Sequence, residues 1–321
     1  MANVGGDAAP GQAPGLDLTV LVPVLNEAEN MRPLVEKIVQ DLKPLGKSYE
    51  ILVIDDGSTD GTFDQLRALA PSTPALRAIR FRRNFGKSAA LSSGFREARG
   101  RVVVTMDGDL QDDSAEIARL LAKIDEGFDL VSGWKQNRKD SISKTVPSKL
   151  FNAVTSAVSG VPLHDMNCGL KAYREEVTRT IHLRGELHRF IPVLAHWSGF
   201  RVGEIRTVHH PRIHGKTKFG VSRFLNGFLD LTAVMFLTTS SNRPVHLFGR
   251  VGIAFALAGA ALTVGYTWPW FLGEGLRLRP GLLFGLVLVI LGIQFVSLGF
   301  LGEMIAGSRA EEPHYAIRER L

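Results

Sequence analysis

This sequence contains a single cysteine, and its first residues show no recognisable targeting signal. Cys168 is the only cysteine among 321 residues, so the chain can form neither an internal disulfide nor a cluster of thiolates for zinc. The first 15 residues, MANVGGDAAPGQAPG, contain no basic start followed by an apolar stretch, and they do not resemble a signal peptide. We therefore expect the front domain to stay in the cytoplasm.

Several nucleotide- and metal-binding motifs are also missing. Gly-Lys-Ser at residues 86–88 lacks the glycine that a P-loop requires five positions earlier, where Phe81 stands. The first apolar run, residues 18–24, holds no G-x-G-x-x-G, which disfavours a dinucleotide-binding fold of that kind. The histidines between residues 209 and 214 do not have the H-E-x-x-H spacing of a helical zinc site. We expect neither a P-loop nor a histidine zinc site.

Charged residues are missing from two long stretches near the C-terminus. Residues 251–272 and 281–302 carry no Asp, Glu, Lys or Arg. At a rise of ~1.5 Å per residue, each stretch is long enough to cross the ~30 Å hydrocarbon core of a bilayer. A pair of buried core helices is the alternative, and the length of both stretches argues against it. We predict two membrane-spanning helices.

Charges and glycines around these stretches predict their arrangement. The link between them, GEGLRLRP, holds Arg277 and Arg279, whereas the outer flanks hold Arg243, Arg250, Arg309, Arg318 and Arg320. This excess of outer positive charge predicts that both termini are cytoplasmic. A net charge of +6 suits either anionic lipid or nucleic acid, and the spans favour lipid, so we expect no nucleic-acid partner. Glycines that recur every seven residues permit close helix contact within the chain or between protomers, which leaves a homo-oligomer open.

The front part of the chain alternates short apolar runs with helical periods. The runs lie in LTVLVPVLNE, YEILVIDDGSTDG, LRAIRF, RVVVTMDGD and FDLVSG, and the helix-like segments span residues 28–42, 62–69, 87–98 and 115–126. This alternation predicts βαβ units around a mostly parallel sheet that is buried on both faces. In such sheets, ligands bind outside the carboxyl ends of the strands.

Polar side chains follow three of the predicted strands. They are Asn26 and Glu27 after the first, Asp55 and Asp56 after the second, and Asp107, Asp109 and Gln111 within VVVTMDGDLQDD, residues 102–113. Helix capping and turn formation are the alternative for Asp55 and Asp56, because DDGSTDGT is rich in turn formers. Carboxylate side chains after three strands instead suit the binding of a nucleotide diphosphate together with its metal ion. Asp107, Asp109 and Gln111 place oxygen ligands at every second position, and Mg²⁺ or Mn²⁺ prefers such ligands.

Six motifs in a fixed order resemble those of inverting family 2 glycosyltransferases with a GT-A fold. They are VPVLNEAENM, VIDDGSTDGT, NFGKSAAL, MDGDLQDD, HDMNCGLKAYR and PRIHGKTKFG. More narrowly, they are similar to the polyprenyl-phosphate sugar transferases, which include dolichyl-phosphate mannosyltransferases, bactoprenol glucosyltransferases and aminoarabinose transferases. The resemblance covers residues 18–245, and two C-terminal spans belong to many members.

The resemblance implies an α/β GT-A domain, Rossmann-like with a mostly parallel sheet, followed by an interfacial amphipathic helix and two transmembrane helices. We expect a disordered tail over 1–17, the GT-A domain over 18–219, the juxtamembrane helix and linker over 220–247, the spans within 248–302 and a cytoplasmic tail over 303–321. The segment VSRFLNGFLDLTAVMF places its apolar residues on one helical face, which suits the membrane interface. Packing against the catalytic core is the alternative for this helix.

The resemblance also implies roles for individual residues. A UDP- or GDP-linked sugar would be held by Pro23, Asn26, Glu27, Asp55, Asp56, Lys87 and Asp107. Asp107, Asp109 and Gln111 would surround the Mg²⁺ or Mn²⁺ ion, with Asp109 and Gln111 as direct ligands. The acceptor phosphate would be bound by Lys135, Lys144, Ser148, Arg212 and Lys218, of which two are lysine where relatives often use arginine. For Lys135 and Lys144 a solvated loop is the alternative.

Asp165, in HDMNCGLKAYR, is a candidate base or sugar ligand beside the catalytic Asp109, and a structural role in its turn is the alternative. The implied reaction is metal-dependent, inverting transfer of a sugar to a polyprenyl phosphate, whose anionic oxygen needs no strong base to attack the anomeric carbon. A processive polysaccharide synthase is disfavoured because Q-x-x-R-W is absent and two spans offer little for a polymer channel. A non-catalytic membrane scaffold is disfavoured by the intact Asp109, Gln111 and Arg212.

Overall fold

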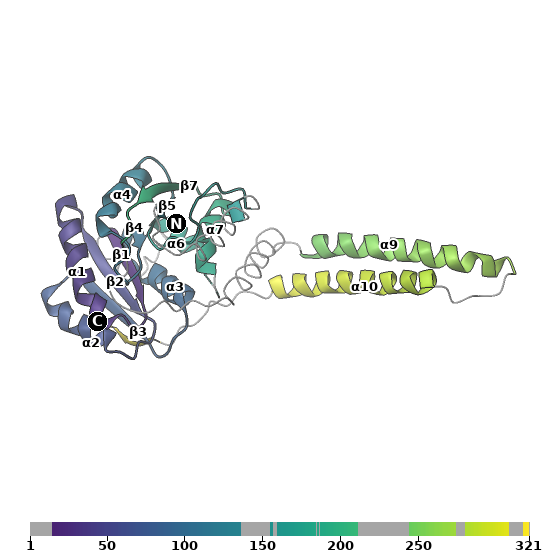
Figure 1. The fold of residues 1–321 in the computed structure, drawn as a ribbon, viewed down its shortest axis with the longest axis horizontal. Coiled ribbons are helices and arrows are strands. Elements are labelled where there is room, and N and C mark those ends of the chain that lie inside the picture. The colour runs from purple at the N-terminus through teal and green to yellow at the C-terminus, as the bar shows by residue number, and fades with distance from the viewer. Residues whose placement is uncertain are drawn as a thin grey trace, which may run out of the picture. The chain divides into compact units, whose positions relative to one another are not determined.

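The structure is a computed structural model, and it describes residues 15–135, 155–156, 159–183, 185, 187–210, 244–273, 280–307 and 317–320. The chain divides into two compact units. One comprises Met1–Asp230 with His314–Leu321, and the other comprises Leu231–Pro313. The first unit is an α/β domain and the second is a helical hairpin (Figure 1).

Among the described residues, the first unit is built on one mixed sheet of eight strands. The strands are β1 (Leu16–Val24), β2 (Tyr49–Asp55), β3 (Leu76–Phe81), β4 (Gly100–Thr105), β5 (Leu130–Lys135), β6 (Lys171–Arg174), β7 (Val202–Thr207) and β8 (Ile317–Arg320). They lie in the order β7-β5-β6-β4-β1-β2-β3-β8. The pairs β1–β2, β1–β4, β2–β3 and β5–β7 are parallel, whereas β6 is antiparallel to β4 and β5, and β8 is antiparallel to β3.

Helices cover both faces of this sheet. They are α1 (Ala28–Leu42), α2 (Thr62–Leu69), α3 (Lys87–Glu97), α4 (Ile117–Asp125), α6 (Glu175–Thr180) and α7 (Ile191–Trp197). Val20 and Val22 of β1 pack in a core with α1, α2 and α4, whereas Leu21 packs in a second core with α3, α6 and α7. Successive strand residues point to opposite faces, so a strand that is buried on both faces is apolar at most positions, and a buried polar residue such as Thr19 needs a partner, here Glu50. This explains the continuous apolar runs.

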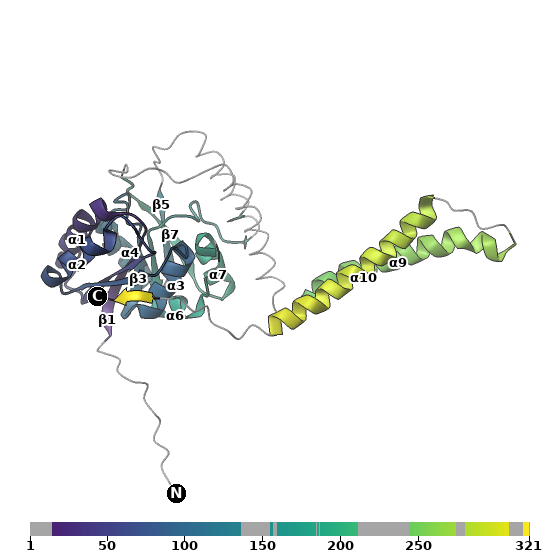
Figure 2. The ribbon, with the colours of Figure 1, turned by 90° about the horizontal axis from the view of Figure 1, so that it is seen from below.

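The predicted fold class is confirmed, and the order of elements predicted for the front of the chain matches. The segments predicted as helical over residues 28–42 and 62–69 coincide with α1 and α2. The strands β6, β7 and β8 were not predicted, and β8 lies within the tail expected over 303–321. Its four residues extend the edge of the sheet beside β3, as both ribbon views show (Figure 2).

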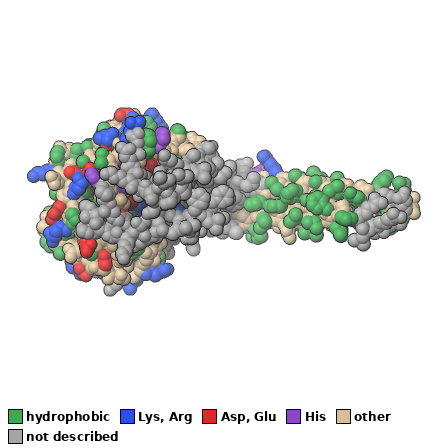
Figure 3. All heavy atoms as spheres, in the orientation of Figure 1, with side chains coloured by type: hydrophobic (Ala, Val, Ile, Leu, Met, Phe, Trp, Pro, Cys, Tyr) green, Lys and Arg blue, Asp and Glu red, His purple; other side chains and the backbone are tan. Residues whose placement is uncertain are grey.

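The described part of the second unit is formed by α9 (Pro244–Phe271) and α10 (Pro280–Gly307). Within them, Phe248–Trp268 and Pro280–Gly302 are long and apolar enough to cross a membrane, with mean hydropathies of 1.6 and 2.5. Apolar side chains cover the visible surface of the hairpin (Figure 3), and Leu257 is 66% exposed. Because large exposed apolar surfaces mark interaction with a membrane or a partner, the second unit has the surface of a membrane hairpin.

Glycines bring α9 and α10 together. A Cβ on Gly259 would lie 2.5 Å from the carbonyl oxygen of Gly285, and one on Gly252 would lie 2.6 Å from that of Gly292. The seven-residue glycine repeats therefore serve contact within the chain. The predicted juxtamembrane helix and linker of residues 220–247 lie outside the described part of the chain, apart from residues 244–247, which begin α9.

Candidate functional site

The loops after β1 and β2 bind each other at one edge of the sheet. The Asn26 N–H donates to Ser58 Oγ at 2.8 Å, and the Asn26 side-chain oxygen accepts from the Thr59 N–H at 2.9 Å. Asn26 has a φ of 55°, in the left-handed region that asparagine tolerates better than most residues. The carboxyl ends of these parallel strands thus form one surface, as predicted for a ligand site.

The two acidic residues after β2 have partners in the protein. Asp55 is fully buried, accepts from the Ser58 N–H at 2.8 Å and lies 3.4 Å from Arg80 Nε. Asp56 accepts from the backbone N–H groups of residues 85 and 86 at 2.7 and 2.8 Å. Burial raises the pKa of both carboxyl groups above the usual value. These contacts are the turn-stabilising role considered above, and nucleotide binding by Asp55 and Asp56 stays a prediction.

The loop after β4 carries the predicted metal ligands. Asp109 is 8% exposed and accepts from the Gln111 N–H at 3.2 Å. Gln111 is bound to the segment after β7, because its carbonyl accepts from the His210 N–H at 2.9 Å and its amide nitrogen donates to the His210 carbonyl at 3.4 Å. Leu110 has a φ of 61°, which is unfavourable for a leucine. Strain of this kind persists where surrounding contacts hold it, and it is common at functional sites.

A buried ion pair stabilises the loop after β4. The Asp112 carboxylate accepts from the Asp107 N–H at 3.1 Å and lies 2.8 Å from Lys135 Nζ. The two side chains are only 1% and 10% exposed. Burial lowers the pKa of Lys135, but Asp112 and the nearby Asp107 outweigh burial and raise the pKa well above its usual value. Sequence reasoning missed Asp112, and it assigned Lys135 to the acceptor phosphate, which stays a prediction.

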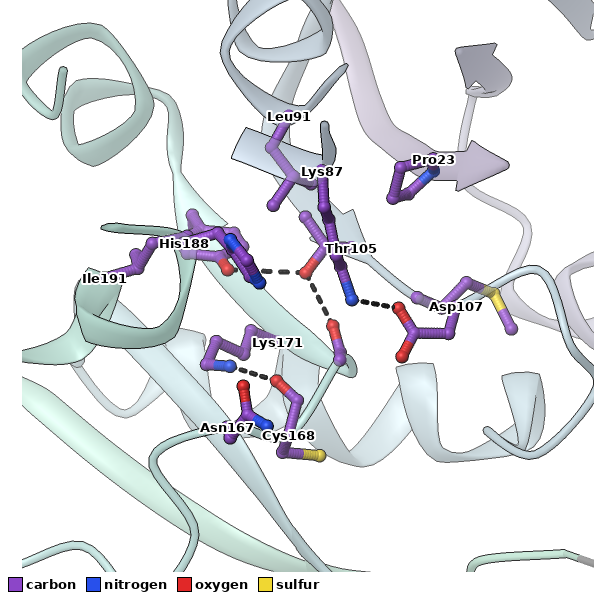
Figure 4. Close-up of a pocket in the computed structure, with 13 residues that line it drawn as sticks. Pro23, Lys87, Leu91, Thr105, Asp107, Asn167, Cys168, Lys171, His188 and Ile191 are labelled. Atoms are coloured by element: carbon purple, nitrogen blue, oxygen red, sulfur yellow. Dashed lines mark hydrogen bonds and ion pairs between the residues drawn. The ribbon is translucent and has the colours of Figure 1, made fainter. Parts of the chain in front are cut away.

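A pocket opens beside Asp107, between β4 and β6. The pocket is small and partly open to solvent, and Figure 4 shows Lys87 and Asp107 on one side and Lys171 and His188 on the other. Lys87 forms an ion pair with Asp107. Partial burial raises the pKa of Asp107, but Lys87 and Lys135 outweigh it and hold the pKa well below its usual value. A Cβ at residue 169 would lie 2.6 Å from Asp107 Cγ, so only Gly169 leaves room for this carboxylate.

The pocket is also lined by the buried Lys171 and the half-buried His188, which the sequence interpretation did not assign. Lys171 is 3% exposed, and its ammonium donates to the Cys168 carbonyl. Burial lowers the pKa of Lys171 below its usual value. His188 Nδ1 lies 3.0 Å from Ser88 Oγ. Burial, together with Lys87 and Arg189, lowers the pKa of His188 to about 3, so this imidazole is neutral at physiological pH.

The remaining predicted residues have different surroundings. Pro23 lines the pocket. The Glu27 N–H donates to Thr62 Oγ1 at 2.9 Å. Asp165 is 3% exposed and accepts from the Asn167 N–H at 3.2 Å, which is a turn contact, and it does not line the pocket. Lys144, Ser148, Arg212 and Lys218 lie outside the described residues.

The residues at this edge fit a cation that protein and nucleotide hold jointly. Within the described ranges, no group of three or more His, Cys, Asp or Glu side chains is arranged to hold a metal ion. Asp109 and Gln111 offer two hard oxygens on one loop. Mg²⁺ is commonly bound by one or two carboxylates together with substrate phosphates, so this small set suits a metal ion that arrives with a diphosphate.

The fold is that of known GT-A glycosyltransferases. A crystal structure of glucosyl-3-phosphoglycerate synthase from Mycobacterium tuberculosis, in complex with Mn²⁺, UDP-glucose and phosphoglyceric acid, superimposes with a TM-score of 0.53. The two sequences are 19% identical, and the match covers 68% of this chain and 80% of the synthase. The likeness concerns the fold alone.

Sequence comparison assigns the family. Residues 19–182 match the model of glycosyl transferase family 2. The chain is 38% identical over 314 residues to a dodecaprenyl-phosphate galacturonate synthase from Rhizobium johnstonii, across 95% of this chain and 93% of the relative. It is 34% identical over 298 residues to an undecaprenyl-phosphate 4-deoxy-4-formamido-L-arabinose transferase from Pseudomonas paraeruginosa, across 90% and 84%. The chain belongs to glycosyl transferase family 2.

Proposed function

We propose that this glycosyltransferase transfers a sugar from a UDP- or GDP-linked donor to a polyprenyl phosphate, with inversion, at the cytoplasmic face of a membrane. The observation that carries the proposal is that the β1 and β2 loops bind each other at the sheet edge where the parallel neighbour β4 also ends, in a chain that also holds two apolar helices long enough to span a membrane. Both named relatives transfer sugars to polyprenyl phosphates, one an acidic sugar and the other a formamido sugar, according to their names.

The donor would lie across the carboxyl ends of β1, β2 and β4. Asn26 and Ser58 fix the nucleotide loops against each other, and the Asp55 and Asp56 carboxylates stiffen them through backbone contacts. Asp109 and Gln111 would hold the cation, which supplies Lewis-acid stabilisation to the departing nucleoside diphosphate. Asp112 contributes by fixing the backbone of this loop at Asp107. A site that is organised before the reaction does not have to reorganise during it, and this lowers the barrier.

The acceptor phosphate needs positive charge and little base catalysis. A phosphate monoester is already an anion at neutral pH, so its oxygen can attack the anomeric carbon directly. Lys135 is paired with Asp112 in the structure, and we therefore assign the main phosphate contacts to Lys144, Ser148, Arg212 and Lys218. Arginine at position 212 suits bidentate contact with phosphate oxygens. Asp165 keeps the role of sugar ligand or base in this proposal.

The membrane hairpin would place both chain ends in the cytoplasm. Cysteine introduced into residues 274–279, between the spans, should react with an impermeant maleimide from outside intact cells, whereas cysteine introduced into the N-terminal tail should not. The native Cys168 should not react with the maleimide, because it is buried and burial raises the pKa of its thiol to about 11. Equal labelling of both positions from outside would contradict the topology.

A lipid-product assay tests the activity. The full-length protein in bilayers, with Mn²⁺, a panel of UDP- and GDP-sugars and a polyprenyl phosphate, should form one monoglycosylated lipid, and chelation should abolish its formation. Asp109→Asn should lower turnover by at least ~100-fold, which corresponds to ~2.7 kcal/mol. Asp125→Asn, at an exposed position on α4, is the control and should keep full activity. Polymer formation would favour a processive synthase, and donor binding without any transfer would favour a scaffold.

A further inference from the structure

The loop after β4 is bound to the segment that follows β7. Three successive residues of this segment have partners in the loop or directly after it. The Val208 N–H donates to the Glu116 carboxylate at 3.3 Å, and His209 forms a β-bridge with Asp112. The third residue, His210, contacts a residue 99 positions earlier in the chain. These contacts hold the loop that carries the proposed cation ligands against the far side of the sheet order.

His210 binds Gln111 at two places. The His210 N–H donates to the Gln111 carbonyl at 2.9 Å, and the Gln111 side-chain nitrogen donates to the His210 carbonyl at 3.4 Å. A glutamine side chain ends in one donor nitrogen and one acceptor oxygen. Because the nitrogen is held by His210, the oxygen is the amide atom that a cation can use, and Mg²⁺ takes oxygen ligands. The contact thus selects the orientation of the amide that suits a metal ion.

The imidazole of His210 is itself held by a carboxylate. Its Nε2 lies 2.9 Å from Asp113 Oδ2, and Nε2 is the donor because an ionised carboxylate only accepts. Asp113 accepts from the Ala115 N–H at 3.1 Å, and its Oδ1 lies 3.0 Å from the ammonium of Lys37 on α1. The Asp113 side chain is only 18% exposed. His210 is therefore fixed through a carboxylate that α1 and the local turn hold in place.

Resting on the proposed function, we infer that His210 is a positioning residue for the cation site, which holds the Gln111 amide with its oxygen available to the metal ion. Groups that orient metal ligands in this way typically change metal affinity by ~10–100-fold when they are removed. A direct bond between the metal and the His210 imidazole is the competing assignment. Glutamine at position 210 distinguishes the two, because its amide can still donate to Asp113 but the imidazole is gone.

Metal affinity of two His210 variants is the first test. In full-length protein in nanodiscs with saturating UDP, His210→Leu should weaken Mn²⁺ binding at least ~10-fold, whereas His210→Gln should stay within ~3-fold of the unaltered protein. Water proton relaxation measures the Mn²⁺ that is bound to the protein. His196→Leu, at an exposed position on α7, is the matched control and should change nothing. Unchanged Mn²⁺ affinity in His210→Leu would overturn the inference. A loss in His210→Gln as large as in His210→Leu would also overturn it and favour the direct bond.

A double-mutant cycle shows whether His210 acts through Gln111. Gln111→Ala should itself weaken Mn²⁺ binding, and His210→Leu should then cost no more than ~2-fold in addition. An equal cost of His210→Leu with and without Gln111 would refute action through this amide.

Binding of UDP without metal, within ~2-fold of the unaltered protein, shows that each variant is folded. If His210→Leu does not fold, Asp113→Ser takes its place in both tests. Serine keeps an oxygen for the Ala115 N–H but is too short to reach His210. Unaltered protein that binds Mn²⁺ with UDP but forms no glycosylated lipid would refute the proposed function alone, and the Mn²⁺ measurements would still decide the role of His210. Absence of Mn²⁺ binding in the presence of UDP would overturn both.

Discussion

Removing the carboxylate of Asp112 should destabilise the protein far more than removing an exposed charge. Asp112→Asn keeps the size of the side chain and an oxygen that can accept from the Asp107 N–H, but it leaves Lys135 buried without its partner. Although burial lowers the pKa of Lys135, Asp112 raises it, so the native site favours the charged ammonium. Breaking a buried ion pair by removing one partner costs ~3–5 kcal/mol. For a domain of ~150–250 residues this lowers Tm by about 6–20 °C.

A double-mutant cycle separates the ion pair from the general cost of substitution. Lys135→Met alone should also be destabilising, because it leaves the Asp112 carboxylate buried without the cation. The double variant, with both charges removed, should be more stable than the sum of the single effects predicts, by ~2 kcal/mol or more. Melting of the full-length proteins in one detergent, followed by intrinsic fluorescence, measures all four corners of the cycle.

The matched control is an exposed ion pair on the same domain. Glu126→Gln breaks the pair with Lys123, in which the two side chains are 57% and 30% exposed, and it should shift Tm by no more than about 1–2 °C. Two results would contradict the prediction: a Tm shift for Asp112→Asn as small as that of the control, or single effects that simply add. Either would show that the pair of Asp112 and Lys135 does not stabilise the loop after β4.

Three further predictions concern other parts of the molecule. The pKa of His188 is lower in the folded chain than in the unfolded one, so the stability it contributes is present above pH 6.5 and is lost as pH falls toward 3. Between pH 6.5 and 5 the protein with His188→Gln should therefore lose less stability than the unaltered protein, by up to ~2 kcal/mol. An unchanged acid dependence of Tm would contradict this. Gly259→Leu should separate α9 from α10 and cost ~1–3 kcal/mol, whereas Gly265→Leu, where nothing lies within 4 Å of an added Cβ, should be tolerated in the same melting assay. Deletion of residues 317–321 should uncover the edge of β3 and raise the rate of hydrogen exchange in β3, while exchange in the central β1 stays slow; equal exchange in β3 with and without the deletion would show that β8 does not pair there.

The front half of the fold follows from local patterns that a sequence displays directly. β1 is buried on both faces, and its neighbours β2 and β4 are parallel to it, so these strands had to be short runs of mostly apolar residues. The helices between them needed only one apolar face each. Both signals depend on residues a few positions apart, and the predicted segments over residues 28–42 and 62–69 therefore agree with α1 and α2.

The candidate site was predictable in outline because of the same regularity. Parallel strands that carry polar residues after their last apolar position must bring those residues to one edge. This argument placed Asn26, Asp55 and Asp109 near one another. The same argument could not predict which carboxylates already accept hydrogen bonds within the protein. The donors to Asp56, for example, are backbone N–H groups 29 and 30 positions further along the chain.

By itself, the sequence determined the α/β class, the family motifs and the two apolar helices, because periodicity and hydropathy are properties of neighbouring residues. Only the tertiary structure decided the burial of Lys171, the pairing of Lys135 with Asp112, and the return of the C-terminal strand β8 to β3. Each of these depends on a partner distant in sequence. The charge on Lys171 and the short segment IRER look like ordinary solvated residues until the antiparallel strands β6 and β8 are placed in the sheet, because burial and strand pairing are set by residues that no local pattern connects.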